Sequence, residues 1–245
     1  MSKVIVITGA GSGLGRALAR RFAADGESVV LLGRTRSKLD AVADEIGEQA
    51  MAVTCDVGSA DSVRAAFAAI TARFPKIDVL INNAAAVDHF EMAEATDDQV
   101  TDAITTNLTG PVLCARAAIP LIAPGGHILN VSSGAVDQAF PGLTLYGATK
   151  AGLERFSLSL HAELAPRGIN VTVVRCGQMV DEDHSWDDPA MVERAALAAA
   201  HGLDPRKRAS SRFSSVTDAF RALIDLPPDL CSASITLRPR AVPSA

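Results

Sequence analysis

The chain opens with the stretch VIVITGAGSGLG at residues 4–15. Residues 4–7 are β-branched, which predicts a short strand buried on both faces, and apolar residues recur at helical spacing over residues 14–24. The glycines between them let the backbone turn tightly and approach a phosphate group. The N-terminus of the following helix presents unpaired N–H groups and the positive end of the helix dipole. The stretch therefore predicts a strand–loop–helix unit that binds a dinucleotide.

The glycine spacing is TGxxxGxG and not GxGxxG, because Leu14 stands where the second pattern needs glycine. A glycine-rich turn that binds nothing is the alternative interpretation, but its place between the first strand and the first helix favours a phosphate site. The residues expected to contact the cofactor here are Gly9, Gly11, Ser12, Gly13, Leu14 and Gly15.

Strand and helix patterns alternate along the rest of the chain. Short apolar runs predict strands at residues 28–32, 52–55, 79–81, 127–131 and 170–174, and helical periodicity covers residues 37–46, 59–74, 145–165 and 189–200. Thr96 and Gln99 have the form of a capping box, which predicts a long helix from there toward Ile122. This alternation predicts an α/β fold, with a parallel sheet covered by helices on both faces.

The composition is that of one globular domain over residues 1–245, with 48% hydrophobic and 21% charged residues. The charge is 23 Lys and Arg minus 28 Asp and Glu, or −5, and only 4% of residues are aromatic, so nucleic acid is not an expected partner. No apolar segment approaches membrane-spanning length, and residues 4–7 are too short for a signal peptide. The cysteines show no CxxC spacing and are expected to be reduced thiols in a cytoplasmic protein: Cys55, Cys114, Cys176 and Cys231.

Basic residues follow the second predicted strand, where NAD sites tend to place an acid that binds the ribose 2′-hydroxyl. Arg34 stands there, with Arg36 and Lys38 nearby. A guanidinium suits a 2′-phosphate through charge-assisted hydrogen bonds, and Ser12 offers an additional hydroxyl. The sequence therefore favours NADP over NAD. The alternative is that Arg34 is a solvated loop residue.

Tyr146 is the only tyrosine in the chain, and Lys150 lies one helical turn later on the same face of a predicted helix. A free tyrosine has a pKa of about 10, and a neighbouring ammonium group favours the phenolate and lowers that pKa. An isolated pair of this kind is usually a solvated helix surface. Here, however, Ser133 follows the strand at residues 127–131, at the sheet edge where parallel sheets bind ligands. The three side chains together predict an acid–base site.

With these motifs the sequence resembles the short-chain dehydrogenase/reductase family over about residues 3–177. The shared motifs stand in the family's order: TGAGSGLG at residues 8–15, Asn82-Asn83-Ala84, Asn107, Ser133 and, thirteen residues after that serine, YGATK at residues 146–150. The resemblance implies a Rossmann-type doubly wound parallel sheet in three α/β/α layers. It also implies an NADP(H)-dependent oxidoreductase that acts on a small alcohol or carbonyl substrate, as a homodimer or homotetramer.

The resemblance assigns four catalytic residues. Tyr146 would be the general acid in reduction and the base in oxidation, and Lys150 would hold the nicotinamide ribose and lower the tyrosine pKa. Ser133 would hydrogen-bond the substrate oxygen. Asn107 would help to hold a water molecule that relays protons to Lys150, although it could instead cap or kink the long helix.

Further cofactor contacts follow from the same resemblance. Asp56 and Val57 would contact adenine, Asn83 and Ala84 would line the ribose side, and Gly177 would lie along the cofactor after the strand at residues 170–174. Asp56 has an alternative role as a cap of the next helix. Asn82 is expected to be structural, and Tyr146 and Lys150 belong to the cofactor site as well as to the catalytic one.

The sequence also departs from the family's pattern. Ala85 occupies the glycine position of Asn-Asn-Ala-Gly, Cys176 replaces a proline, and Asp181 replaces a threonine that commonly contacts the nicotinamide carboxamide. The chain ends in an arginine–proline tail in place of a glycine-rich segment. That ending weakens the case for a tetramer built on the last strand.

Residues 178–215 are expected to form a substrate lid, and the loop between Ser133 and Tyr146 a second wall of the substrate pocket. Candidates in that pocket are Asp137, Gln138, Phe140, His89 and Phe90. Trp186 is expected either to close over the substrate or to pack against the base of the lid. No metal is expected, because no spacing directs His184 and the acids around it to one point: Asp181, Glu182, Asp183, Asp187 and Asp188.

Two other functions fit the same fold. A catalytically inactive nucleotide-binding regulator would have lost Ser133, Tyr146 or Lys150, and all three are present. A cofactor-free lyase or dehalogenase would have an altered glycine loop, and this loop is intact. The sequence therefore favours the oxidoreductase and leaves its substrate open.

Overall fold

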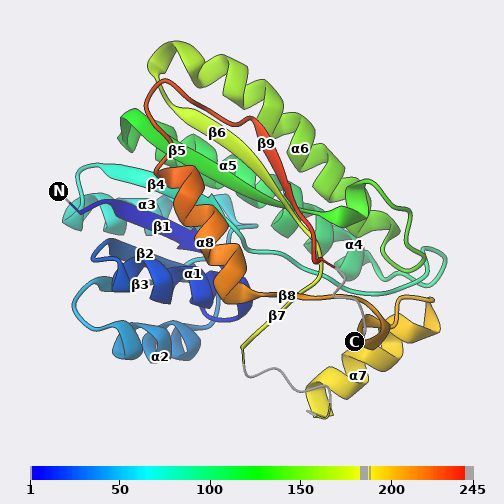
Figure 1. Cartoon of the computed structure of the whole chain (residues 1–245). Coiled ribbons are helices and arrows are strands. Elements are labelled where there is room, and N and C mark those ends of the chain that lie inside the picture. The colour runs from blue at the N-terminus through cyan, green and yellow to red at the C-terminus, as the bar shows by residue number, and fades with distance from the viewer. Residues whose placement is uncertain (1, 183–186, 188, 241–245) are drawn as a thin grey trace.

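The protein is described by a computed structural model that covers residues 2–182, 187 and 189–240. Its centre is a seven-stranded sheet in the order β3-β2-β1-β4-β5-β6-β9, in which every pair of neighbours runs parallel (Figure 1). The strands are β1 Val4–Thr8, β2 Ser28–Gly33, β3 Ala50–Thr54, β4 Ile77–Asn82, β5 Ile122–Ser133, β6 Asn170–Cys176 and β9 Ser234–Leu237. The predicted doubly wound α/β fold is confirmed.

Helices cover both faces of this sheet. One face carries α1 Gly13–Ala24, α2 Arg36–Ile46 and α8 Phe213–Ile224, and the other carries α3 Ala60–Arg73, α5 Gly110–Ala118 and α6 Thr144–Leu164. Successive side chains of a strand point to opposite faces, so Ile5 and Ile7 of β1 join one core while Val6 joins the other. Both cores are therefore apolar, which explains the unbroken β-branched run at the start of the chain.

The strand order reverses direction beside β1, since β2 and β3 lie on one side of it and β4, β5 and β6 on the other. In open parallel sheets a crevice opens at such a point, outside the carboxyl ends of the strands. The glycine loop leaves β1 at this edge, and Ser133 ends β5 at the same edge. The topology thus brings the predicted cofactor and catalytic residues together.

The long helix predicted from Thr96 toward Ile122 is interrupted. Thr96 and Gln99 form the expected capping box and begin α4 Asp97–Ile104. A π-helical turn, Thr105–Thr109, follows and leads into α5, and a short 3-10 turn, Ile119–Leu121, precedes β5. Single π-turns inside helices frequently mark functional positions, and this one contains Asn107.

Between β6 and α8 the chain forms a small separate layer. It contains β7 Met179–Val180, α7 Pro189–Ala200, a 3-10 turn Pro205–Lys207 and β8 Ser211–Arg212, which pairs with β7 (Figure 1). The helix expected at residues 189–200 is confirmed. The pattern analysis missed β7, β8, β9 and α8, and because α8 packs on α1 it belongs to the main helical layer. No helix within the described residues has the length and apolarity to cross a membrane.

Candidate active site

The glycine loop is shaped by close backbone approaches. Gly9 has φ +67°, and a Cβ on Gly15 would lie 2.2 Å from the Gly9 carbonyl oxygen, so neither position tolerates a side chain without rearrangement. Asn83, at the end of β4, donates from Nδ2 to the carbonyl oxygen of Thr8 at 2.9 Å. The Thr8 hydroxyl accepts from the backbone N–H of Asn83 and of Ala84. Asn83 and Ala84 therefore hold the start of the glycine loop through hydrogen bonds to Thr8.

The N-terminus of α1 is open to a groove of about 600 Å³. Ser12 is the N-cap but its side chain caps nothing, and the first turn contains no acidic residue. The backbone N–H groups of that turn are left for an anion, as a dinucleotide pyrophosphate requires. The groove runs from Gly9, Gly11, Ser12, Gly13 and Leu14 past Gly33 and Arg34 to Cys55, Asp56 and Val57, with Asn83 and Ala84 along its floor. Its open helix N-terminus and glycine-lined wall fit a dinucleotide.

Arg34 and Lys38 line the far end of this groove. The Arg34 guanidinium is 64% exposed and lies 3.6 Å from Asp102, a loose ion pair in solvent. Arg36 is turned away and forms an ion pair with Asp40 at 2.7 Å. Of the basic cluster after β2, Arg34 and Lys38 therefore line the groove and Arg36 does not.

Asp56 and Val57 follow β3 as expected and form part of the groove wall. The Asp56 carboxylate accepts a hydrogen bond from the backbone N–H of Gly58 at 3.0 Å, while Ser59 caps α3. Val57 is buried. Asp56 thus stabilises the turn that follows β3 and also lines the groove.

Ser133 and Tyr146 meet at the carboxyl end of β5. Ser133 Oγ accepts from the backbone N–H of Ala135 at 3.2 Å, and the Ser133 and Tyr146 side chains line the same cavity. Burial raises the pKa of Tyr146 above its usual value of 10, and the Ser133 hydroxyl acts in the opposite direction.

Lys150 is 2% exposed and lies one turn from Tyr146 on α6. Its Nζ donates to the carbonyl oxygen of Val131 at 2.8 Å and lies 5.8 Å from the centre of the Tyr146 ring. Burial lowers the pKa of Lys150 to about 8. Desolvation of the phenol is the largest effect on the Tyr146 pKa, and its net shift is upward. The expected lowering of that pKa by Lys150 stays a prediction.

Asn107 is fully buried in the π-turn. Its Oδ1 accepts from the backbone N–H of Ala86 at 2.8 Å, and its Nδ2 donates to the carbonyl oxygen of Ala86 at 2.8 Å and to Thr149 Oγ1 at 3.3 Å. Asn107 therefore connects the segment after β4 to the residue that precedes Lys150. Asn82 is structural as expected, donating to Asn130 Oδ1 at 2.8 Å.

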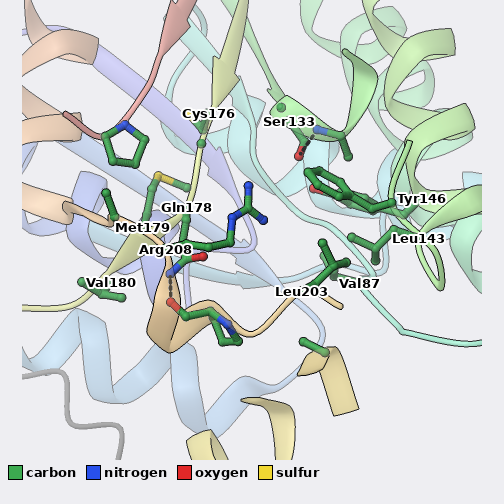
Figure 2. A pocket seen from close by; sticks show the side chains of 18 of the residues that line it. Val87, Ser133, Leu143, Tyr146, Cys176, Gln178, Met179, Val180, Leu203 and Arg208 are labelled. Carbon is green, nitrogen blue, oxygen red and sulfur yellow. Dashed lines mark hydrogen bonds between the residues drawn. The ribbon is translucent and has the colours of Figure 1, made fainter. Parts of the chain in front are cut away.

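A second cavity, of about 860 Å³, opens above Ser133 and Tyr146 (Figure 2). It shares Ser12, Gly13, Val87, Met179 and Phe213 with the groove, so the two are continuous. Its walls come from the loop before Tyr146, the segment after β6 and the C-terminal tail, and include Cys176, Gly177, Asp181 and the expected His89, Gln138 and Phe140.

Two expected pocket residues lie elsewhere. Asp137 is held outside the cavity by ion pairs with Arg175 and Arg238, and Phe90 is not among the lining residues, its backbone N–H donating to the carbonyl oxygen of Gly142. Arg208 lies within the expected lid, whereas the lining residues that the sequence did not indicate include Val87, Arg238 and Pro239. The arginine–proline tail was noted in the sequence, but its distance along the chain gave no sign that it reaches this pocket.

The short chain dehydrogenase family model matches residues 3–188 of the chain. The chain belongs to the short-chain dehydrogenase/reductase family. It is 37% identical over 188 residues to a serine 3-dehydrogenase of Agrobacterium fabrum, covering 74% of each chain. It is 34% identical over 177 residues to an NADP-dependent 3-hydroxy acid dehydrogenase of Salmonella typhi, covering 71% of each. Among solved structures, a closed serine dehydrogenase complexed with NADP+ matches with a TM-score of 0.83 and 25% identity over 99% of this chain and 98% of that one.

This short-chain dehydrogenase carries its three departures from the family pattern around the cofactor groove and the cavity. Ala85 lines the groove and is exposed, Cys176 is buried beneath the cavity, and Asp181 stands at its rim. Burial raises the pKa of the Cys176 thiol to about 12, so it is a neutral apolar group beside Lys150. Asp181 Oδ1 accepts from the backbone N–H of Glu182, and the Asp181 carbonyl oxygen accepts from Arg212.

Several expectations for the lid concern residues outside those described, namely Trp186, His184, Asp183 and Asp188. Among the residues that the structure does cover, no cluster of His, Cys, Asp and Glu side chains has the arrangement of a metal site. The following helix α7 ends at Ala200, and Gly202, at φ +75°, lies just beyond it.

Proposed function

We propose that this short-chain dehydrogenase transfers hydride between NADP(H) and a small alcohol or ketone, with Tyr146 as the general acid and base. One observation carries the proposal: Ser133 and Tyr146 line a cavity that is continuous with the groove at the glycine loop. A reacting carbon placed above this pair would have the cofactor on one side and acid–base groups on the other.

Ser133 and Tyr146 have different roles in the reduction. The Ser133 hydroxyl hydrogen-bonds the substrate oxygen and stabilises the negative charge that develops there. The Tyr146 hydroxyl donates its proton to that oxygen as hydride reaches the carbon, and in oxidation the tyrosine takes the proton back. When bound, the cofactor supplies or accepts the hydride.

Lys150 stabilises the phenolate that Tyr146 becomes after donating its proton. Its buried ammonium group has no carboxylate partner among the described residues, and it is held by the Val131 carbonyl. A positive charge in a site of low polarity stabilises the phenolate form of Tyr146 relative to the phenol form. Asn107 acts as a positioning residue, because it fixes Ala86 and Thr149 on either side of this centre.

We also infer a preference for NADP over NAD. Arg34 and Lys38 present two positive charges at the adenosine end of the groove, and the acid nearest to them, Asp102, already lies beside Arg34. A 2′-phosphate would gain two cationic partners there, whereas a 2′-hydroxyl would find no carboxylate acceptor after β2.

Assembly into a homodimer or homotetramer is part of the same proposal. Two large apolar side chains, Ile104 on α4 and Leu158 on α6, are 39% and 42% exposed on neighbouring helices. We assign these two side chains to the surface that a second copy would cover.

The test is a cofactor-oxidation screen over small ketones, aldehydes and oxo acids, with NADPH and NADH run side by side. The expected result is oxidation of NADPH with at least one carbonyl compound, and slower reaction with NADH at equal concentration. A protein that binds NADPH tightly but oxidises it with no member of a broad panel would favour the regulator over the enzyme.

A further inference from the structure

The catalytic cavity contains a guanidinium group that the catalytic mechanism does not use. Arg208 lies in the segment between the 3-10 turn at Pro205–Lys207 and β8, and its side chain points into the middle of the cavity between Gln178 and Tyr146 (Figure 2). Within the described residues no carboxylate forms an ion pair with it. The family model ends at residue 188, so Arg208 lies beyond the part of the chain that this model matches.

The segment that carries Arg208 is anchored to the floor of the cavity. Gln178 Nε2 donates to the carbonyl oxygen of Pro205 at 2.7 Å and to Ser210 Oγ at 2.8 Å, and the Gln178 carbonyl oxygen accepts from the backbone N–H of Ser211 at 3.0 Å. Three hydrogen bonds thus fix the chain on both sides of Arg208. A preorganised cation loses less freedom when a ligand binds.

Arg208 is also oriented by an aromatic ring from the opposite wall. Its guanidinium carbon lies 5.0 Å from the centre of the Phe140 ring, within the range of a cation–π contact. Such a contact holds one face of the guanidinium and leaves its N–H edge available for hydrogen bonds. The edge of a planar guanidinium is the part that binds a carboxylate with two parallel bonds.

The other charged residues around the cavity are already engaged. Arg238 forms an ion pair with Asp137 at 2.9 Å, and the Asp181 carboxylate accepts from the backbone N–H of Glu182. On the segment itself, Arg206 forms an ion pair with Asp204 at 2.8 Å and does not line the cavity. Arg208 is therefore a cavity-lining cation that has no carboxylate partner among the described residues.

We propose that Arg208 binds a carboxylate on the substrate, so that the physiological substrate is a hydroxy acid or the matching oxo acid. The carboxylate would be held by Arg208 while the hydroxyl or carbonyl oxygen lies against Ser133 and Tyr146. This assignment rests on the proposed function and names the substrate class of the same site. A merely structural latch, in which Arg208 only ties its segment to Phe140, is the competing role.

The test compares acids with their own methyl esters in three proteins. Oxidation of 2-, 3- and 4-hydroxy acids and of the corresponding methyl esters is measured with NADP+ in the wild type, in Arg208→Met and in Lys207→Met. Lys207 is the matched control, because its substitution removes the same charge from the same segment without touching the cavity lining.

For Arg208→Met, kcat/KM for the preferred acid should fall about 10- to 100-fold, the loss expected when a charge-assisted bidentate pair is removed from a partly exposed site. For the esters it should change less than about threefold, and Lys207→Met should leave both within about threefold. Arg208→Lys should recover part of the loss for acids only. An equal loss for acids and esters would establish the latch and overturn the carboxylate site.

Binding measured without turnover separates this proposal from the proposed function. Calorimetry with sodium propanoate and with sodium methanesulfonate on the NADP-loaded protein should show binding that Arg208→Met abolishes, and weaker binding of the sulfonate would favour carboxylate as the natural group. If propanoate binds through Arg208 but no alcohol is oxidised, the oxidoreductase assignment fails and the anion site stands. If neutral alcohols are oxidised as well as acids and Arg208→Met changes neither, the anion site fails and the oxidoreductase stands.

Discussion

The preference for NADP can be tested at a single residue. Replacing Arg34 with Ala removes the guanidinium that lines the adenosine end of the groove. A hydrogen bond to a charged group contributes about 1.5–3 kcal/mol. Arg34 is 64% exposed, so solvent screening reduces this to about 1–2 kcal/mol.

The ion pair that Arg34 makes with Asp102 changes this figure little. The pair is 3.6 Å long between side chains that are 64% and 43% exposed, and exposed pairs of this kind contribute about 0–1 kcal/mol. The Kd for NADPH should therefore rise about 5- to 30-fold in Arg34→Ala. The Kd for NADH should change less than about twofold, since a 2′-hydroxyl offers the guanidinium no charge.

The assay is titration of each reduced cofactor followed by its own fluorescence, at 0.05 M and 0.3 M salt. The effect on NADPH should shrink at the higher salt concentration, because screening weakens exposed charge pairs. Arg36→Ala is the matched control, as it removes an equally exposed arginine that is paired with Asp40 away from the groove. Equal losses of affinity for NADPH and NADH would refute the phosphate role of Arg34.

Two further predictions concern buried groups. Folding lowers the pKa of Lys150 from 10.5 to about 8, so the unfolded chain binds that proton more tightly. The charged lysine therefore lowers the free energy of unfolding fully below pH 8. This loss shrinks as the pH rises from 8 to 10.5. Lys150→Met should thus raise the free energy of unfolding at pH 7 by up to about 3 kcal/mol, and this gain should disappear above pH 10.5. Denaturant titrations at both pH values measure it. No gain at pH 7 would contradict the assigned pKa. Iodoacetamide at pH 8 should modify the exposed Cys231 of the native protein and leave Cys55, Cys114 and Cys176 unmodified, because burial raises the pKa of all three thiols. Mass spectrometry of the digested protein checks this, and rapid labelling of Cys176 would show that the thiol is reactive.

The sequence predicted well those features that depend on neighbours along the chain. The glycine loop follows from the strand before it and the helix after it, and the helical spacing of Tyr146 and Lys150 places both on one face of α6. The capping box at Thr96 was likewise correct, because all of its hydrogen bonds lie within one helical turn.

Features that depend on contacts between distant segments were not predictable. The π-turn at Asn107 accompanies hydrogen bonds to Ala86, twenty-one residues away in the chain. The direction of Arg208 depends on Gln178 and Phe140, which local patterns do not connect with it. The upward shift of the Tyr146 pKa is a further example, since the helical spacing to Lys150 predicts proximity but not how deeply the phenol is buried.

The central claim is that Tyr146 transfers the proton while the groove binds the cofactor independently of it. The most direct measurement is Tyr146→Phe, assayed for turnover with the best substrate of the carbonyl screen and for NADPH affinity by fluorescence. The account predicts that kcat falls by at least about 1000-fold, because the acid and base are lost, while the Kd for NADPH stays within about threefold of the wild type. Turnover that survives the substitution undiminished would contradict the assignment of Tyr146 and, with it, the proposed mechanism.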